Sequence, residues 1–111
     1  MQGGDIQDQV LFQMYLGMVE FGMNVQEAVE APYFWSYQMR NSFGDHRAQP
    51  GRLLLNEDTP PYVVKDLKER GYDVEFRDKT SGPINAIEFD HERGTMMGGS
   101  SDFGEDYGLA W

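Results

Sequence analysis

The sequence contains no cysteine, so disulfide bonds and thiolate chemistry are excluded, whereas the cellular compartment stays open. Basic residues are few: 9 lysines and arginines stand against 19 acidic residues, and the formal net charge is −10. This negative charge repels phosphate backbones and anionic lipid headgroups, which argues against nucleic acid or a membrane surface as a partner. Long apolar runs are also missing, because Gln13 and Glu20 interrupt the most hydrophobic stretch before it reaches the ~20 residues that a membrane span needs.

The composition nevertheless predicts a folded chain. Hydrophobic residues make up 40% of the 111 residues and aromatic residues 14%, which is too much for a disordered acidic tail. The length suits one domain with a modest core. We therefore expect residues 1–111 to form a single folded segment.

The first apolar pattern predicts a helix that begins after Asp5 and ends near Gly22. One stripe recurs at three- and four-residue steps, as residues on one face of a helix do. Its members are Ile6, Val10, Met14, Gly17, Met18 and Phe21. A second apolar stripe consists of Leu11, Tyr15 and Val19. We therefore expect this helix to be covered on both sides, with Asp5 as its cap and Asp8 in its first turn.

Two further helices have start and stop signals. Asn24, with Glu27 three residues later, forms a capping-box pattern that predicts a short helix ended by Pro32. Thr59 is expected to cap a third helix that has proline at its first positions and closes at Gly71.

The remaining apolar patterns predict strands. There are four of them: a run of leucines, a stretch in which apolar and charged residues alternate, a hairpin with a turn at HERG, and a short apolar stretch at the end. These lie at residues 53–55, 72–77, 84–101 and 107–111. The order of elements predicts an α+β fold, or a layered α/β fold, with helices packed on an antiparallel sheet.

Two glycine pairs are candidates for special backbone positions. Gly3 and Gly4 precede the first helix, where unpaired amides and the positive helix end can face an anion, although such a pair is also common as a plain tight turn. Gly98 and Gly99 lie inside the expected hairpin. We predict a turn or bulge there, because no helix follows that could make a phosphate site.

The histidines and threonines offer no chemistry of their own. His46 and His91 fall in expected loops, and they do not reproduce the spacing of zinc ligands, so no metal or cofactor is expected. Thr59, Thr80 and Thr95 are predicted to be caps or strand residues. None of them is N-terminal, as a threonine nucleophile with its own free amine must be.

Several elements, in this order, resemble the C-terminal part of the small subunit of the γ-glutamyltranspeptidase family. The match runs along nearly the whole chain, and its strongest piece is FGMNVQEAVEAPYF. The matching elements are Gly3-Gly4-Asp5 with Gln7, the stretch from Phe21 through Pro32, the stretch from Leu67 to Phe76, Ala86-Ile87, and the glycine-bearing stretch from Gly98 to Asp102.

The resemblance implies a place within an αββα sandwich of an N-terminal nucleophile hydrolase. In that family a precursor cleaves itself, and the freed N-terminal threonine attacks a γ-glutamyl amide such as glutathione before water or an amine takes the acyl group. Gly3 and Gly4 would correspond to the glycines whose amides form the oxyanion hole. The threonine and the residues that bind the glutamyl group would precede residue 1.

The resemblance also implies that this chain is the C-terminal part of a catalytic domain. Its partner would be the rest of a parent polypeptide, with a higher oligomer left open, and the isolated segment is predicted to be inactive. Two alternatives remain. Where relatives carry an Asp-Pro-Arg turn, this chain reads Asp102-Phe103-Gly104-Glu105-Asp106, so the resemblance implies no role for a basic residue there. The glycine loop also lacks the PGG form of other members, which indicates a divergent branch, and a related acylase acting on another acyl amide is the first alternative. A non-catalytic binding module is the second, because the segment holds no nucleophile.

Overall fold

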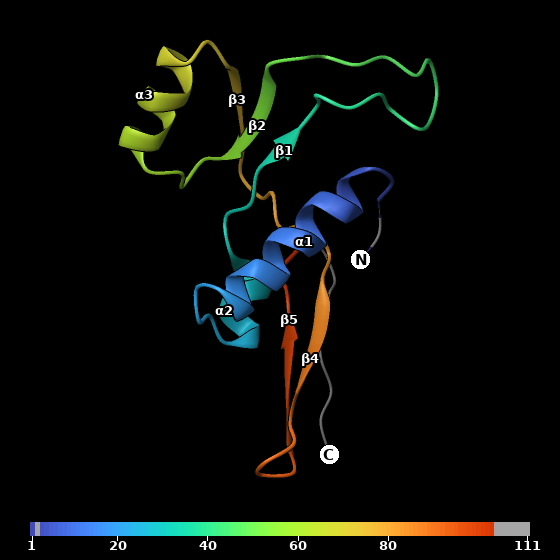
Figure 1. The fold of residues 1–111 in the computed structure, drawn as a ribbon, viewed down its shortest axis with the longest axis vertical. Coiled ribbons are helices and arrows are strands. Elements are labelled where there is room, and N and C mark those ends of the chain that lie inside the picture. Colours follow the sequence, from blue (N-terminus) through green and yellow to red (C-terminus); the bar gives the residue numbers. More distant parts are fainter. Residues whose placement is uncertain (2, 104–111) are drawn as a thin grey trace.

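A computed structural model describes residue 1 and residues 3–103, and this part of the chain forms three helices and two small sheets. The helices are α1 (Ile6–Val19), α2 (Val25–Glu30) and α3 (Pro61–Glu69). The strands are β1 (Trp35–Ser36), β2 (Arg52–Asn56), β3 (Asp73–Arg77), β4 (Asn85–Asp90) and β5 (Thr95–Ser100). Figure 1 shows α1 and α2 between the first sheet with α3 and the hairpin β4–β5. The predicted α+β class is confirmed, and the strand expected at 107–111 lies outside the described residues.

The first sheet has the order β1-β2-β3 and is mixed. β1 runs antiparallel to β2, and β4 runs antiparallel to β5 in the separate hairpin, as expected. The expectation of an antiparallel sheet is wrong for β2 and β3, which are parallel, with Leu54 opposite Glu75. The reason is α3, which follows β2 and returns the chain to the end of the sheet where β2 began.

The three helix starts differ from one another. At α2 the predicted capping box is present: the Asn24 side chain accepts from the Glu27 amide at 2.9 Å, and Glu27 accepts from the Asn24 amide at 2.8 Å. Asp5 occupies the N-cap position of α1, but its side chain makes no cap hydrogen bond. Pro60, rather than Thr59, is the N-cap of α3. Pro61 then takes the first helical position, where a missing amide proton costs no helical hydrogen bond.

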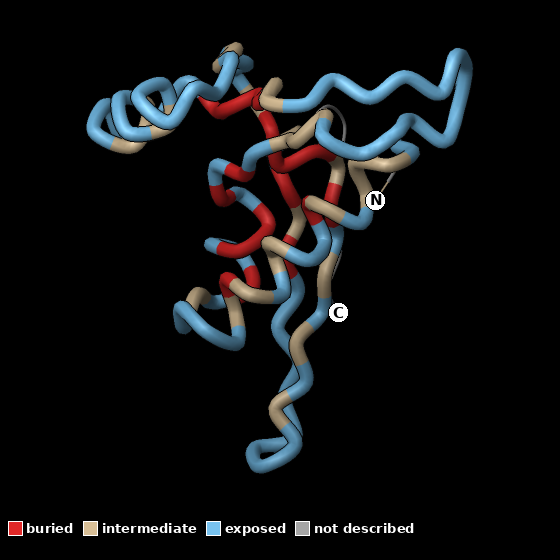
Figure 2. The backbone as a smooth tube through the Cα atoms, turned by 45° about the horizontal axis from the view of Figure 1, so that its top comes forward, coloured by how far each residue is buried: buried red, intermediate tan, exposed pale blue. Residues whose placement is uncertain are grey.

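One buried cluster lies where α1, α2 and the segment between β3 and β4 meet, and Leu53, Leu54 and Leu55 of β2 are buried as well, so both regions are red in Figure 2. Ile84, from that segment, is fully buried, and Ile6 and Met14 of α1 pack against the same cluster. The buried cluster consists of Val10, Val29, Ala31, Tyr33 and Ile84. Burial raises the pKa of the Tyr33 phenol to about 12, and its hydroxyl donates to the carbonyl of Ala28. The first stripe of α1 is therefore a packing face, as predicted, except that Phe21, beyond the end of the helix, is exposed.

The second apolar stripe of α1 is not covered within the described chain. Tyr15 is 58% exposed and Val19 52%, so the expectation that the helix is covered on both sides does not hold here. The hairpin has a second open apolar face, with Phe89 at 58% and its cross-strand partner Met96 at 69%. Among the described elements, α2 and β1 pack on α1, and α2 packs on the hairpin. Because they cover other faces, these two apolar surfaces remain open.

Gly98 and Gly99 form neither a turn nor a bulge, which corrects the sequence-based expectation. Both lie in β5 in continuous register, opposite Ile87 and Ala86. Gly99 is buried because α2 packs directly on it: a Cβ atom there would lie 2.8 Å from the carbonyl oxygen of Val25. The glycine therefore permits a close approach of two backbones.

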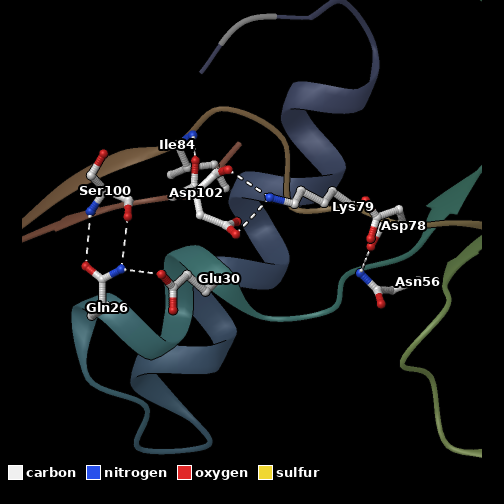
Figure 3. Close-up of polar contacts among 9 residues, drawn as sticks. Gln26, Glu30, Asn56, Asp78, Lys79, Ile84, Ser100 and Asp102 are labelled. Carbon is white, nitrogen blue, oxygen red and sulfur yellow. Dashed lines mark hydrogen bonds and ion pairs between the residues drawn. The ribbon is translucent and has the colours of Figure 1, made fainter. Parts of the chain in front are cut away.

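A set of polar contacts ties α2 and the segment after β3 to the end of β5 (Figure 3). The Gln26 side chain pairs with the backbone of Ser100, donating at 2.9 Å and accepting at 3.2 Å. The Lys79 ammonium group donates to the carboxylate of Asp102 at 2.8 Å and to its carbonyl at 2.9 Å. The Gln26 contacts hold β5 against α2, and the Lys79 contacts hold the segment after β3 against the residues that follow β5.

Candidate active-site loop

The Gly3-Gly4 turn presents two open amides at the N-terminal end of α1. Gly3 has φ +123°, a conformation that residues with a side chain rarely adopt. Both glycines are exposed, and neither amide donates to an acceptor among the described residues. Since the helix dipole adds positive potential at this end, the turn is suited to face a negatively charged oxygen.

Contacts on both sides fix this turn. The carbonyl of Gly4 accepts from the Gln7 amide at 3.0 Å, and the Gln7 side chain donates to the carbonyl of Met1 at 2.6 Å. Asp5 reaches across to Ser42, whose amide donates to the Asp5 carboxylate at 2.7 Å. The hydroxyl and amide of Ser42 both lower the pKa of the Asp5 carboxyl below its usual 3.8. Asp5 thus binds a distant loop instead of capping its own helix.

That loop is the segment between β1 and β2, residues 37–51, which reaches toward the N-terminal end of α1 (Figure 1). Its two arms are joined by backbone hydrogen bonds from Gln49 to Tyr37 at 2.9 Å and from Asn41 to Arg47 at 3.0 Å. The Phe43 ring rests on Gly4, because a Cβ atom on Gly4 would lie 2.7 Å from the ring Cε2. Sequence reasoning missed both contacts, of Phe43 with Gly4 and of Ser42 with Asp5, since no local pattern links residues so far apart in the chain.

A cavity of about 430 Å³ opens between the loop and the glycine turn, lined by Gly4, Phe43 and Arg40 among others. The other two arginines that line it have carboxylate partners. Arg47 pairs with Asp45 at 2.8 Å, and Arg52 pairs with Glu75 at 2.8 Å. Arg40 forms no ion pair with any residue that the structure describes. The cavity therefore has Gly4 of the turn and an arginine without a carboxylate partner among the described residues in its lining.

The remaining candidate residues are not brought together. His46 lies in the loop, where its Nδ1 donates to the carbonyl of Asn41 at 3.0 Å, whereas His91 lies at the hairpin turn and stacks on Phe89. Thr80 is buried in the segment before β4, and Thr95 begins β5. Over residue 1 and residues 3–103, no three His, Cys, Asp or Glu side chains cluster as metal ligands would. The described helices are too short or too polar to cross a membrane.

Comparisons with solved structures show the fold of N-terminal nucleophile hydrolases. Cephalosporin acylase from Bacillus halodurans is similar with a TM-score of 0.81 and 21% identity, over 99% of this chain and 19% of that one. γ-Glutamyltranspeptidase from Pseudomonas nitroreducens, complexed with L-DON, is similar with a TM-score of 0.76 and 21% identity, over 99% of this chain and 52% of that one.

Residues 1–110 match the family model described as Gamma-glutamyltranspeptidase, so the chain belongs to the γ-glutamyltranspeptidase family. Among curated proteins it is 33% identical over 86 residues to the acylase ACY 1 proenzyme of Pseudomonas sp. strain SE83. That match covers 78% of this chain and 13% of the proenzyme. The chain therefore spans about one eighth of the length of this relative.

Proposed function

We propose that this chain supplies the oxyanion-hole amides and part of the core of an enzyme that hydrolyses or transfers acyl groups from amides. The observation that carries the proposal is the Gly3-Gly4 turn at the positive end of α1: neither amide has an acceptor among the described residues, and Gly4 lines a cavity. Membership of the family supports it, because an acyl-transfer reaction of this kind requires such donors.

The proposed reaction assigns this chain a role in one step. An N-terminal threonine, contributed by a segment that precedes residue 1 in the order of the family, attacks the carbonyl carbon of the amide. The carbonyl π electrons move to oxygen, and the amides of Gly3 and Gly4 stabilise this oxyanion by donating hydrogen bonds. The free terminal amine of the threonine takes the hydroxyl proton during the attack and passes it to the leaving nitrogen. The oxyanion electrons re-form the carbonyl, the C–N bond breaks and the amine leaves. Water or an acceptor amine then attacks the ester, gives up a proton to the terminal amine and releases the acyl group, while the threonine oxygen regains its proton.

The open apolar surfaces support a larger parent polypeptide. The second stripe of α1 and the outer face of the hairpin need a cover, and the relative that matches is a much longer proenzyme. Denaturing intact-mass spectrometry on the native protein tests this: we expect a companion polypeptide with an N-terminal threonine. Detection of the 12.7 kDa chain alone would favour a binding module instead.

The acyl group is either γ-glutamyl or that of a related acylase. The resemblance favours γ-glutamyl amides, whereas the similarity to an acylase proenzyme favours another acyl amide. Turnover of γ-glutamyl-p-nitroanilide and of glutaryl-p-nitroanilide by the native protein distinguishes the two. We expect the isolated residues 1–111 to cleave neither, because they hold no threonine nucleophile with a free amine.

The test of the oxyanion hole is Gly4→Pro in the native protein, because proline removes the amide proton. Loss of one such donor lowers kcat about 10²- to 10³-fold. Gly4→Ala keeps the proton and is the matched variant, so Gly4→Pro should have a much lower kcat than Gly4→Ala. Equal turnover by the two variants, with matching circular dichroism spectra, would refute the role of the Gly4 amide.

A further inference from the structure

We propose that Phe43 is a specificity-determining residue of the acyl site, and that Asp5 is the positioning residue that holds it there. This inference rests on the proposed function of the Gly3-Gly4 turn. In this inference, the loop of residues 37–51 forms one wall of the acyl pocket. That wall lies beside the carbon atom of the acyl group that is bonded to the scissile carbonyl.

The position of Phe43 is not explained by the core. The side chain is 66% exposed and is absent from the buried cluster around Ile84, so packing contributes little to its placement. Its ring nevertheless lies against Gly4, at a distance that leaves no room for a Cβ atom. An aromatic ring that lies outside the core and rests beside two open amides is placed to contact a molecule bound at those amides.

Asp5 accounts for how an exposed loop keeps this geometry. It follows Gly4 directly in the chain, and its carboxylate accepts from the amide of Ser42, the residue before Phe43. The ionised side chain of Asp5, which follows the two glycines, is therefore bound to Ser42, which precedes Phe43. Hydrogen bonds to an ionised acceptor are stronger than neutral ones, so this link restrains the loop tip.

The ring then acts by shape. When the carbonyl oxygen of a bound acyl group accepts from the Gly4 amide, the carbon next to that carbonyl lies against the Phe43 ring, because the ring covers Gly4. An unbranched chain fits there, whereas a methyl branch on that carbon meets the ring. One methyl group against a pocket wall changes kcat/KM by about 10- to 200-fold.

The first experiment tests the link in the native protein without any substrate. Asp5→Ala should speed hydrogen exchange of the Ser42 amide, because the amide loses its acceptor. Asp8→Ala is the matched control: it removes the same charge near the same end of α1, in the first turn rather than at the N-cap, and Asp8 makes no hydrogen bond to the loop. Equal exchange of Ser42 in both variants would overturn the positioning role of Asp5.

The second experiment measures selectivity. The probes are the p-nitroanilide that the native protein cleaves, γ-glutamyl or glutaryl, and its analogue with a methyl group on the carbon next to the scissile carbonyl. Phe43→Ala should raise the ratio of kcat/KM, branched over unbranched, by about tenfold or more. Asp5→Ala should raise it in the same direction, since the ring is no longer held. Phe21→Ala removes an exposed ring beyond the other end of α1 and should leave the ratio unchanged.

The outcomes separate this inference from the function on which it rests. An unchanged ratio in Phe43→Ala, with turnover intact, overturns the role of Phe43 alone. Full activity of Gly4→Pro overturns the oxyanion hole while a changed ratio in Phe43→Ala still supports the wall. Absence of turnover by the native protein with both unbranched probes overturns the proposed function and this inference with it.

Discussion

Replacing Gly99 by alanine is expected to loosen the contact between β5 and α2. The added Cβ atom would lie 2.8 Å from the carbonyl oxygen of Val25, 3.0 Å from its carbonyl carbon and 3.1 Å from its Cγ2. Two of these three atoms are backbone, in the first residue of α2, so a simple side-chain rotation cannot make room. Overpacking of a tight contact costs about 1–3 kcal/mol, and Gly99 is buried, so we expect a loss in that range.

Hydrogen exchange measures this loss locally, in the native protein and without unfolding the rest of it. A cost of about 1–3 kcal/mol corresponds to exchange about 5- to 140-fold faster, since each 1.4 kcal/mol is a factor of ten. The peptides to follow cover α2 and the hairpin β4–β5, where the two backbones meet.

Gly98→Ala is the matched control for Gly99→Ala. Gly98 is the preceding residue of the same strand, but its Cβ atom would meet nothing within 4 Å. We expect exchange at or slightly below the wild-type rate, because alanine restricts the unfolded chain more than glycine does. If the two variants exchange alike in α2 and the hairpin, the close approach of β5 and α2 is not what requires glycine.

Three further perturbations test the core and the helix start. Ile84→Ala removes a fully buried side chain and should lower the free energy of unfolding of this region by about 2–5 kcal/mol, measured by chemical denaturation; a loss below 1 kcal/mol would contradict the burial. Asn24→Ala should cost about 1 kcal/mol through the lost cap, whereas Asn24→Ser should cost little, and exchange in α2 distinguishes them. The raised pKa of Tyr33 stabilises the fold fully below pH 10, and this contribution is lost as the pH rises through about 12. A pH series of denaturation midpoints checks it, with Tyr33→Phe expected to lack that alkaline loss.

Local patterns predicted the elements whose partners are close in sequence. The capping box needs only Asn24 and Glu27, and the hairpin needs two apolar stretches around a short turn, so both were predictable. The Gly3-Gly4 turn was also predictable, because a glycine pair before a helix start is a local signal. Its role in catalysis stays a prediction.

Contacts between distant residues were beyond the reach of these patterns. The amide of Ser42 holds Asp5, and the indole of Trp35 donates to the carbonyl of Thr80 at 2.8 Å, yet neither pair has a sequence signature. Asp5 looked like a cap because acceptor side chains at that position usually bind the first-turn amides. The parallel pairing of β2 and β3 was missed for the same reason, since strand direction depends on where α3 packs.

Because Ile84 is needed to complete the core, the core cannot form until late in the synthesis of this chain by the ribosome. Val10, Val29 and Tyr33 leave the ribosome first, and about fifty residues follow before Ile84 can cover them. At roughly 5–20 residues per second, this interval lasts roughly 3–10 s. The apolar surface of α1 and α2 is open during that time, when it is available to chaperones or to a second nascent chain. Insertions in residues 37–51 would lengthen the interval and increase aggregation, even where the folded structure tolerates them.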